Sequence, residues 1–595
     1  MSARPVYAER SDSFLGIERS ATGRRWVKRL NQHQESIALA LTQRLGLPEI
    51  VGRVVAARGA TLENAESYLE PRLRDLMTDP SRMTDCNAAV DRLARAIERR
   101  ERIAIFGDYD VDGAASSAIL SLTLRELGCE TEIYIPDRIT EGYGPNAPAV
   151  RALRERGASL LVTVDCGTMS HDAIEEANRV GLEVVVIDHH QQGDTLPAAL
   201  AIVNPNRDDD LSGLGHLCAT GVAFMVLVAL RRKLARIDFP DLMVLLDLVA
   251  LATVCDMVPL RDLNRAFVVQ GLNVLNMGRN VGLRALARTA RVSGFVKVRD
   301  LSFLLGPRIN AGGRVGDAAL GARLLCERDP DRAEEIAARL EAYNKERQAI
   351  EANVLADAVA EAEREVRGTP PAVIITASEG WHPGVVGLVA SRLKDRFDRP
   401  SFAIGFDGQG RGTGSGRSVP EVDLGRLVRT AAKEGLLLKG GGHAMAAGLT
   451  IERDRLGPFR SFAERNAEAA IKARHVITRE IDGALAASGA TEDLIDLLDR
   501  GGPYGTGQPN PVFALPSVTI TECRTVGRNH LAARLRDEDG VAIRGIAFRA
   551  NGSPLGDFLR TRVGNRAHLV GTLERDEYRG RTNISLRIDD AADPV

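Results

Sequence analysis

The segment IAIFGDYDVDG, residues 103–113, places three aspartates at alternate positions directly after an apolar run. In an extended chain, Asp108, Asp110 and Asp112 would bring at least two carboxylates onto one side. Carboxylates this close repel one another unless a positive group lies between them. Oxygen-rich ligand sets with an occasional imidazole suit Mn²⁺ or Mg²⁺ better than zinc. The spacing therefore predicts a divalent metal site.

Two more apolar runs end in acidic residues, LLVTVDCG at Asp165 and VVVIDHH at Asp188, and Asp256 follows a further run in ATVCDMVPL. In open parallel sheets, ligands bind outside the carboxyl ends of the strands. The residues expected to meet at one such edge are Asp108, Asp110, Asp112, Asp165, Asp188, His189, His190 and Asp256. Two cations that share one carboxylate would satisfy this cluster. Two metal ions can activate a water and stabilise both oxygens of a phosphoryl displacement.

Each of these acids also has a simpler interpretation. A single aspartate after a strand usually caps a helix or forms a turn, and for Asp165 or Asp256 alone that interpretation is favoured. The combination favours a metal site, because four separate segments would otherwise each need an acid at the same edge by coincidence. Asp108 stays open as a ligand, since only two of the three acids in its segment need to bind metal. Nucleotide-binding folds have no support, because the chain has no GxxxxGK[ST] and no GxGxxG after a strand.

The elements that would position these residues alternate in type. The short apolar runs IAIF, TEIYI, LLVTV and VVVI alternate with helical patterns at residues 114–127, 146–156 and 171–180. This alternation is typical of an α/β fold with a parallel sheet and crossover helices. The run LVALATVCD near residue 250 continues it. The apolar stretch 242–260 contains Asp247 and Asp256, which favours a buried helix or strand over a membrane span.

The remainder of the chain predicts further domains. Residues 331–366 have the pattern of one long charged helix that ends at RGTPP. AVIITAS, a helix near 384–396 and SFAIGF predict a second α/β region, with two glycine-rich loops, GQGRGTGSGRS and KGGGHAMAAG. After about residue 475, short strands with turns predict a small β-barrel. The predicted segments are a helical N-terminal extension (1–80), a catalytic domain (81–330), a connecting helix (331–367), a second domain (368–474) and the barrel (475–595).

The composition limits the class of protein. A chain of 595 residues is too long for one core and predicts three or four domains. With 44% hydrophobic residues, 27% charged residues and a formal net charge of -2, it resembles an ordinary soluble protein without an overall basic field. Seven scattered cysteines without a CxxC pair indicate a reducing compartment. The N-terminus lacks the apolar core of a signal peptide, so we expect a cytoplasmic protein with no membrane span. We also expect a monomer.

The motifs GDYDVDG, VTVDCG, VIDHH and VCDMVPL resemble, in this order, the first four motifs of the DHH phosphoesterase superfamily. The resemblance is fullest to the RecJ exonuclease family. It extends through GPRINAGGR, GWHPGVVGLVASRL, GSGRS, GGGHAMAAG and GPYGTGQPNPVF, and through the stretch that precedes the first motif. It implies a DHH catalytic domain, a DHHA1 substrate-binding domain and a C-terminal OB-fold that binds nucleic acid.

The resemblance also implies an activity. Members of the family are 5′→3′ exonucleases that hydrolyse single-stranded DNA to 5′-mononucleotides with two Mn²⁺ or Mg²⁺ ions, in DNA repair and recombination. A RecQ-type helicase and a single-strand-binding protein are the implied partners.

The metal-site roles that the resemblance implies can be placed residue by residue. The metal ligands would be Asp110, Asp112, Asp165, His189 and Asp256, with Asp165 bridging both ions. His190 would face the scissile phosphate and Asp188 would support the histidine pair. Some DHH enzymes have a histidine ligand four residues before the first of these acids. Phe106 stands there in this chain, so Asp108 or water would take that place.

The substrate contacts implied by the resemblance lie in the later motifs. They are Arg308, Asn310, Arg314, Arg417, Ser418, Gly442 and His443. Arg308 and Arg314 flank a small-residue turn, 310–313. The guanidinium group of an arginine can donate two parallel hydrogen bonds to the oxygens of one phosphate. A tight turn without a ligand is the simpler interpretation of each glycine-rich loop, and the spacing alone favours it.

The predicted barrel is rich in arginine, which bears on the choice between the possible functions. Residues 501–595 contain 13 arginines and no lysine against 11 acidic residues, and guanidinium groups stack on bases and bind phosphates. We expect a chain that ends near Glu480 to keep the chemistry but to hold long strands poorly. The alternatives are a DHH phosphodiesterase for short oligonucleotides or cyclic dinucleotides, which needs only the two α/β domains, and a binding scaffold, which would have lost motif acids.

Overall fold

A computed structural model describes residues 13–137, 141–142, 144–366, 370–473, 477–578 and 581–595. Within them the chain forms two compact units. One comprises the described parts of Met1–Leu76, Pro259–Arg261 and His475–Val595, and the other those of Met77–Val258 and Asp262–Arg474. All seven cysteines are free thiols. Among the described residues, no helix is both long and apolar enough to cross a membrane.

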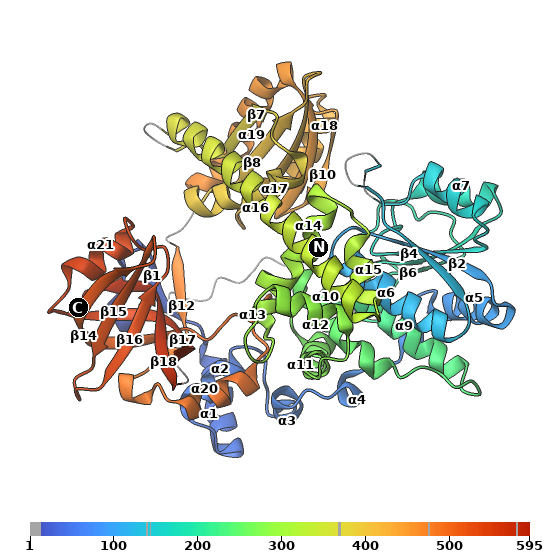
Figure 1. The fold of residues 1–595 in the computed structure, drawn as a ribbon. Helices are drawn as coiled ribbons and strands as arrows, with labels where there is room; N and C mark the ends of the chain where they lie inside the picture. The colour runs from blue at the N-terminus through green and yellow to red at the C-terminus, as the bar shows by residue number, and fades with distance from the viewer. Residues whose placement is uncertain (1–12, 138–140, 143, 367–369, 474–476, 579–580) are drawn as a thin grey trace. The chain divides into compact units, whose positions relative to one another are not determined.

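A five-stranded parallel sheet, of order β3-β2-β4-β5-β6, forms the first part of the larger unit (Figure 1). The strands are β2 (Arg102–Gly107), β3 (Glu130–Tyr134), β4 (Leu160–Val164), β5 (Glu183–Ile187) and β6 (Ala201–Val203). The helices of this region are α5 (Cys86–Arg99), α6 (Val111–Glu126), α7 (Ala147–Glu155), α8 (His171–Arg179) and α9 (Ala219–Lys233). The predicted runs and crossover helices are confirmed, whereas strand β6 and helices α5 and α9 were not predicted. Every side chain of β4 is buried, as expected for a strand covered on both faces.

Helices alone follow the sheet. They are α10 (Leu246–Cys255), α11 (Asp262–Asn276), α12 (Val281–Thr289), α13 (Val298–Asp300), α14 (Gly306–Val315) and α15 (Leu320–Cys326). The run LVALATVCD is therefore a helix and adds no strand to the pattern. Residues 246–254 are all buried, so no polar face marks the helical period. The expected turn at 310–313 is likewise wrong, because these residues lie inside α14.

The long helix α16 (Pro330–Glu365) agrees with the helical pattern predicted over residues 331–366 to within one residue at each end. Asp329 caps it, accepting hydrogen bonds from the backbone N–H groups of Asp331 and Arg332, and Pro330 occupies the first helical position. In Figure 1, α16 extends from the helices beside the parallel sheet to the second sheet of the same unit.

That second sheet is mixed, with strand order β10-β11-β9-β8-β7. Its elements are β7 (Ile374–Glu379), α17 (Pro383–Phe397), β8 (Ser401–Phe406), β9 (Arg411–Arg417), α18 (Leu424–Lys433), β10 (Lys439–His443), β11 (Ala446–Glu452) and α19 (Leu456–Lys472). The glycine-rich segments are mainly strands, which corrects the prediction of loops. An ideal Cβ on Gly416 would lie 2.4 Å from the ring of Phe402, and one on Gly412 would lie 2.7 Å from the ring of Phe406. Glycine is needed at these buried positions because neighbouring side chains fill the space.

The smaller unit joins the N-terminal segment to the barrel. Its N-terminal elements are β1 (Arg25–Lys28), α1 (Gln32–Leu45), α2 (Glu49–Ala56), α3 (Ala65–Leu69) and α4 (Leu73–Leu76). Its C-terminal elements are β12 (Thr478–Ile481), β13 (Gly483–Ala484), α20 (Glu492–Gly501), β14 (Phe513–Val526), β15 (His530–Arg536), β16 (Ala542–Ala547), α21 (Pro554–Thr561), β17 (Arg566–Tyr578) and β18 (Arg581–Ala592). Strands pair in the order β13-β14-β15-β16-β18-β17, and pairing of β14 with β17 closes the predicted barrel.

The N-terminal segment is no separate helical extension. Strand β1 pairs in parallel with β12, and Trp26 donates its indole N–H to Asp590 across 2.9 Å. Arg58 and Asp482 form a buried, two-pronged ion pair with N–O distances of 2.8 and 3.2 Å. Removing Asp482 would leave the buried guanidinium of Arg58 without its counter-charge, whereas Asp482 also pairs with Arg29 at 3.2 Å. The segment and the barrel therefore share one core.

Candidate metal centre

Asp108 and Asp110 lie in the loop between β2 and α6. Asp110 caps α6, and its Oδ1 accepts hydrogen bonds from the backbone N–H groups of Asp112 at 2.9 Å and Gly113 at 3.2 Å. Gly113 is required here, because an ideal Cβ would lie 2.3 Å from the carbonyl oxygen of Asp108. The cap and the close contact fix the backbone from which these carboxylates project.

Asp112 lies buried in the first turn of α6, against the start of α9. Its Oδ2 accepts from the backbone N–H of Ala219 at 2.7 Å. Its Oδ1 accepts from the backbone N–H of Thr220 at 2.8 Å and from the hydroxyl of Thr220 at 2.6 Å. The positive end of the α9 dipole thus holds this carboxylate in one orientation.

Asp165 follows β4 in a left-handed backbone conformation, with φ of 58°. Such strain in a residue other than glycine persists only where the surroundings fix it. The residue is 2% exposed. Burial raises the pKa of its carboxyl well above the ordinary value, and the charges of Asp112, Asp110, Asp108 and Asp256 add to this effect. A carboxylate held among four others is suited to bind cations.

Asp188 supports both histidines from the end of β5. Its Oδ1 accepts from the backbone N–H of His189 and from Nδ1–H of His190, each at 2.8 Å, and its Oδ2 accepts from Thr168 N–H at 3.1 Å. Burial alone would raise the pKa of Asp188 and lower that of His190. Their hydrogen bond and opposite charges outweigh burial, so the pKa of Asp188 falls below its usual range and that of His190 rises to about 9.

His189 stands at the centre of the carboxylates. Its Nε2 lies 3.3 Å from Asp165 Oδ1, 3.6 Å from Asp256 Oδ2 and 3.8 Å from Asp112 Oδ2. Asp256 ends helix α10. Burial, followed by the charges of Asp112 and Asp110, raises the pKa of Asp256 to about 9. Asp256 therefore lies in the cluster as predicted, although the apolar run before it is a helix and not a strand.

Three overlapping donor sets follow from this geometry, in each of which the potential ligand atoms lie within 4.8 Å of one another. The sets are Asp165, His189 and His190; Asp112, His189 and Asp256; and Asp108, Asp110 and Asp165. Asp165 and His189 each belong to two sets. Carboxylate oxygens with imidazole nitrogen match Mn²⁺ or Mg²⁺, and a cation would relieve the repulsion that raises these pKa values. The residues present therefore fit two such ions.

The Phe106 side chain is fully buried and packs against Tyr134, with ring centroids 5.2 Å apart. It offers no ligand atom. The donor set that includes Asp108 consists of three carboxylates and contains no imidazole.

Sequence reasoning missed a supporting pair after β6. Asn204 donates from Nδ2 to the hydroxyl of Thr168 at 2.9 Å and to the carbonyl of His190 at 2.8 Å. Asn206 donates from Nδ2 to the carbonyl of His189 at 2.5 Å. Both side chains fix the backbone of the histidine pair. The sequence AIVNPN could have indicated this pair, because it places two asparagines directly after another apolar run.

The predicted substrate residues of α14 lie beside the cluster. An ideal Cβ on Gly313 would lie 2.5 Å from the Tyr109 ring, so this glycine admits the loop that carries Asp108 and Asp110. Arg308 pairs with Glu341 of α16 at 2.7 Å, and Arg314 donates from Nη1 to the carbonyl of Gly384 at 2.9 Å. The buried Oδ1 of Asn310 has no hydrogen-bond partner within the described part of the chain.

The remaining predicted contacts lie on the second sheet. Arg417 donates to the hydroxyl of Ser415 at 3.0 Å and to the carbonyl of Gly416 at 2.9 Å. The buried hydroxyl of Ser418 donates to the Val422 carbonyl at 2.6 Å, so its only proton is already used within the protein. Gly442 has φ of 138° and no room for a Cβ, and His443 ends β10 exposed. The structure thus gives Ser418 and Gly442 structural tasks.

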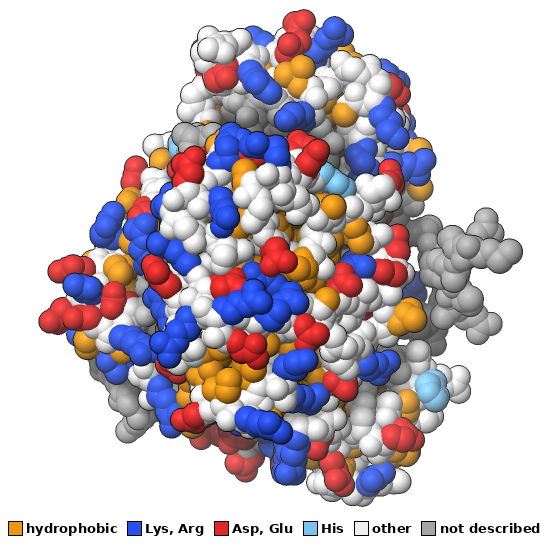
Figure 2. All heavy atoms as spheres, turned by 90° about the vertical axis from the view of Figure 1, so that its right-hand side faces the viewer, with side chains coloured by type: hydrophobic (Ala, Val, Ile, Leu, Met, Phe, Trp, Pro, Cys, Tyr) orange, Lys and Arg blue, Asp and Glu red, His pale blue; other side chains and the backbone are white. Residues whose placement is uncertain are grey.

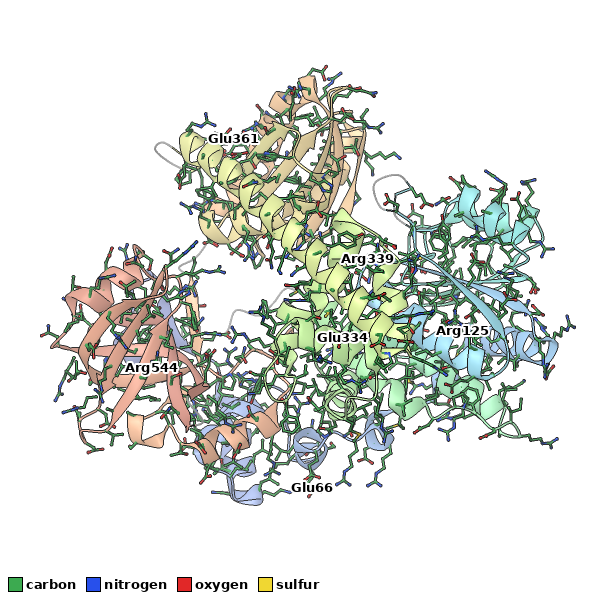
Figure 3. All side chains as sticks on the ribbon, in the orientation of Figure 1. Glu66, Arg125, Glu334, Arg339, Glu361 and Arg544 are labelled. Atoms are coloured by element: carbon green, nitrogen blue, oxygen red, sulfur yellow. The ribbon has the colours of Figure 1, made fainter. Side chains whose placement is uncertain are left out.

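The barrel has a groove of about 660 Å³, lined by residues of β14, β15, β16 and β18. Arg534 of β15 lies opposite Arg544 of β16, and Arg524 of β14 lines the same groove. All three arginine side chains are exposed, and Figure 3 labels Arg544 on the barrel.

Models of three domains match the chain. The DHH family, N-terminal domain, matches residues 102–253; the DHHA1 domain matches residues 370–469; and the RecJ OB domain matches residues 481–590. Their order is the one that the motifs predicted.

Relatives of known name match nearly the whole chain. It is 37% identical over 560 residues to the single-stranded-DNA-specific exonuclease RecJ of Dickeya dadantii, covering 91% of this chain and 96% of the relative. The same enzyme of Escherichia coli is 36% identical over 563 residues, with coverage of 91% and 96%.

Solved structures agree. The crystal structure of RecJ in complex with Mn²⁺ from Thermus thermophilus superposes with a TM-score of 0.78 and 29% identity over 96% of this chain and 79% of that chain. For the Mg²⁺ complex the TM-score is 0.73, with 27% identity and coverage of 96% and 78%.

Proposed function

Because this chain belongs to the RecJ family of single-stranded-DNA-specific exonucleases, we propose that it hydrolyses single-stranded DNA from the 5′ end to 5′-mononucleotides. The observation that carries the proposal is the overlap of donor sets at Asp165 and His189. A site of this kind suits two adjacent Mn²⁺ or Mg²⁺ ions.

We assign the ligands as Asp108, Asp110, Asp112, Asp165, His189 and Asp256, with Asp165 shared. Bound ions would activate water and neutralise the charge that develops on the phosphate. Asp112 and Asp188 are fixed by backbone N–H groups, so the ligand shell needs little rearrangement before reaction.

His190 is assigned to the scissile phosphate. Its Nδ1–H is bound by Asp188, which fixes the ring, and the side chain is 38% exposed beside the cluster. An imidazole held in this way can donate its other N–H to a phosphate oxygen. Arg308, Asn310, Arg314, Arg417 and His443 are proposed to contact the DNA backbone further along the strand.

The groove of the barrel supports a role in holding long single strands, which distinguishes this proposal from a phosphodiesterase for short oligonucleotides or cyclic dinucleotides. We propose that the enzyme acts in DNA repair and recombination, as a cytoplasmic monomer, with a RecQ-type helicase and a single-strand-binding protein as partners. The free thiols fit a reducing compartment.

The test is digestion of single- and double-stranded DNA labelled at either end, with Mn²⁺, Mg²⁺ or EDTA. We expect a 5′ label on single strands to be released first as a mononucleotide, with either metal and not with EDTA. Faster release of a 3′ label would contradict the polarity. Cleavage of a cyclic dinucleotide in preference to a long strand would favour the alternative.

A further inference from the structure

The groove of the barrel occupies one end of a longer sheet face. Strands β14, β15 and β16 are antiparallel neighbours. Alternate residues of β15 and β16 lie in the barrel core, namely Leu531, Ala533, Leu535, Ile543 and Ala547. Because successive side chains of a strand point to opposite faces, the residues between them face outward. Cross-strand partners share a face, so the outer face can be followed from strand to strand.

Three rows of neighbouring residues make up this outer face. The rows are Glu522 with Arg534 and Arg544, then Arg524 with Ala532 and Ile546, then Val526 with His530 and Phe548. The groove is lined by members of the first two rows, and the third row lies beyond them. Rows two residues apart along a strand are separated by about 7 Å, so the first and third rows are roughly 13 Å apart.

The third row ends in an exposed aromatic pair. The Phe548 side chain is 47% exposed. Its ring centroid lies 5.3 Å from that of His530, with the rings inclined at 67°, which is an edge-to-face contact. Arg549 donates its backbone N–H to Nδ1 of His530 at 2.9 Å, which fixes the imidazole ring and places its proton on Nε2. A fixed ring therefore supports the exposed ring of Phe548.

The charge of this face favours a polyanion. A single exposed apolar residue is common on protein surfaces, but Phe548 shares its face with three arginines and is followed by exposed Arg549. Glu522 is the one acid among the nine residues of the three rows, and it lies 3.6 Å from Arg524. Basic grooves combined with aromatic rings are typical of sites for single-stranded nucleic acid, where cations contact the backbone and bases stack on the rings.

We propose that Phe548, supported by His530, is a stacking subsite for one base of single-stranded DNA. The arginines of the first two rows contact phosphates of the same strand, and the aromatic pair adds a contact with a base. Every base has a π face, so the subsite accepts any of the four. This proposal rests on the proposed binding of single strands at the groove, and all of its residues lie in the barrel.

The test is equilibrium binding to full-length protein in EDTA, which prevents cleavage. The probes are a long oligothymidylate and a strand of the same length whose sugars carry no bases. In Phe548→Ala we expect affinity for oligothymidylate to fall by about fivefold or more, the loss typical of removing one stacking ring. Affinity for the strand without bases should stay unchanged. The salt dependence should also stay unchanged, because the variant keeps the phosphate contacts.

Conservative variants and a matched control keep the result interpretable. Phe548→Tyr keeps the ring and should bind like the natural protein. Phe548→Leu keeps an apolar side chain without a ring and should lose affinity as Phe548→Ala does. Val563→Ala truncates another exposed apolar side chain of the barrel, 42% exposed, and should change neither affinity. Unchanged binding of oligothymidylate in Phe548→Ala, or an equal loss for both strands, would overturn the proposal.

The variant in which Arg524, Arg534 and Arg544 are all glutamine separates this proposal from the proposed role of the groove. That variant should bind both strands more weakly. If it does so and Phe548→Ala binds normally, the stacking subsite is wrong and the groove stands. If Phe548→Ala loses affinity for oligothymidylate alone and the arginine variant binds normally, the stacking subsite stands and the groove is wrong. Normal binding by both variants would contradict both.

Discussion

Asp165 combines a left-handed backbone, near-complete burial and four carboxylate neighbours. These features oppose stability and are expected where a residue is kept for its function. Its neighbours His189 and His190 are held by Asp188, Asn204 and Asn206, none of which needs to touch a metal ion.

Asp165→Ala should lower turnover by at least about a hundredfold, the loss that follows removal of one electrostatic group from an active site. The fold should survive, because the change removes one acid from a cluster of like charges. Steady-state cleavage in Mn²⁺, together with circular dichroism, checks both statements. Near-normal turnover would contradict the shared-ligand role, and loss of the fold would give Asp165 a structural one.

The stability of the metal-free protein should fall as pH rises from about 5 to about 9. Unfolded aspartates titrate near pH 4, whereas the pKa of Asp256 is raised to about 9 and that of Asp165 is also raised. The pKa of His190 is also raised to about 9, so above pH 6.5 its contribution to the free energy of unfolding likewise decreases as pH rises. The native state then holds more protons than the unfolded state, so the free energy of unfolding decreases with pH.

Thermal-unfolding midpoints in EDTA at several pH values measure this dependence. Mn²⁺ should reverse it, because ions compete with protons for the same carboxylates. Asp256→Asn should flatten the profile in EDTA. A midpoint in EDTA that rises between pH 6 and 8.5 would contradict the raised pKa values.

Among the residues, the strand-end acids could be predicted, since the carboxyl ends of parallel strands meet at one edge. Asn204 and Asn206 could also have been predicted, because they follow the apolar run of β6 as the acids follow the other strands. The structural role of Ser418 could not be predicted. Its hydroxyl donates to the carbonyl of Val422, four residues later, and nothing in the sequence GSGRS indicates that contact.

At the scale of elements, helix α14 connects several parts of the larger unit. Gly313 accommodates Tyr109 of the acid-bearing loop, Arg308 pairs with α16, and Arg314 contacts the start of α17. The sequence predicted a turn here because its small residues suggested one. The small residues lie inside a helix instead, because close-packed neighbours leave no room for larger side chains at Gly312 and Gly313.

Arg314→Ala should weaken binding of single-stranded DNA or slow turnover by about tenfold, and Mn²⁺ affinity should be unchanged. The guanidinium fixes the start of α17 through Gly384 and lies on the helix beside the acid loop. Calorimetric metal titration beside DNA binding separates the two quantities. Arg314→Lys keeps the positive charge but lacks the paired N–H donors of a guanidinium, so it should recover only part of the DNA binding or turnover that Arg314→Ala loses. A fall in metal affinity alone would place Arg314 in support of the metal site instead.

Many helices and strands were predictable from a polar face or from an acid at a strand end, and two elements show why others were not. Helix α10 has no polar face because it is buried all round. Strand β9 alternates buried glycines with exposed or half-buried residues, which is the period of two expected for a strand, but its high glycine content suggested a loop.

For the whole molecule, a net charge of -2 requires any DNA path to be local. Figure 2 shows basic and acidic side chains interspersed on one face of the molecule. On the barrel, Arg524, Arg534 and Arg544 gather at one groove. Ending the chain near Glu480 would also remove Asp482 and the rest of the shared core, so truncation would not test this groove cleanly.

Replacing Arg524, Arg534 and Arg544 together by glutamine should weaken binding of a long single strand and leave cleavage of very short oligonucleotides nearly unchanged. The slope of log affinity against log salt should decrease by about 0.7 for each phosphate that the variant no longer neutralises. Binding at several salt concentrations measures the slope. Arg562→Gln, at a barrel arginine paired with Asp593, is the control. An unchanged slope would mean that the groove does not hold DNA.

The parallel pairing of β1 with β12 has a consequence for synthesis. Trp26 and its partner Asp590 are 564 residues apart in the chain. At about 5–20 residues per second, the ribosome needs roughly half a minute to two minutes to supply that partner. Meanwhile Ile17 and Trp26 have no cluster to join, because the other buried residues of their cluster lie at Ile481 and beyond, and the larger unit can fold behind them. In nascent chains stalled near residue 470, residues 13–28 should be cut readily by protease, whereas in the released protein they should resist it.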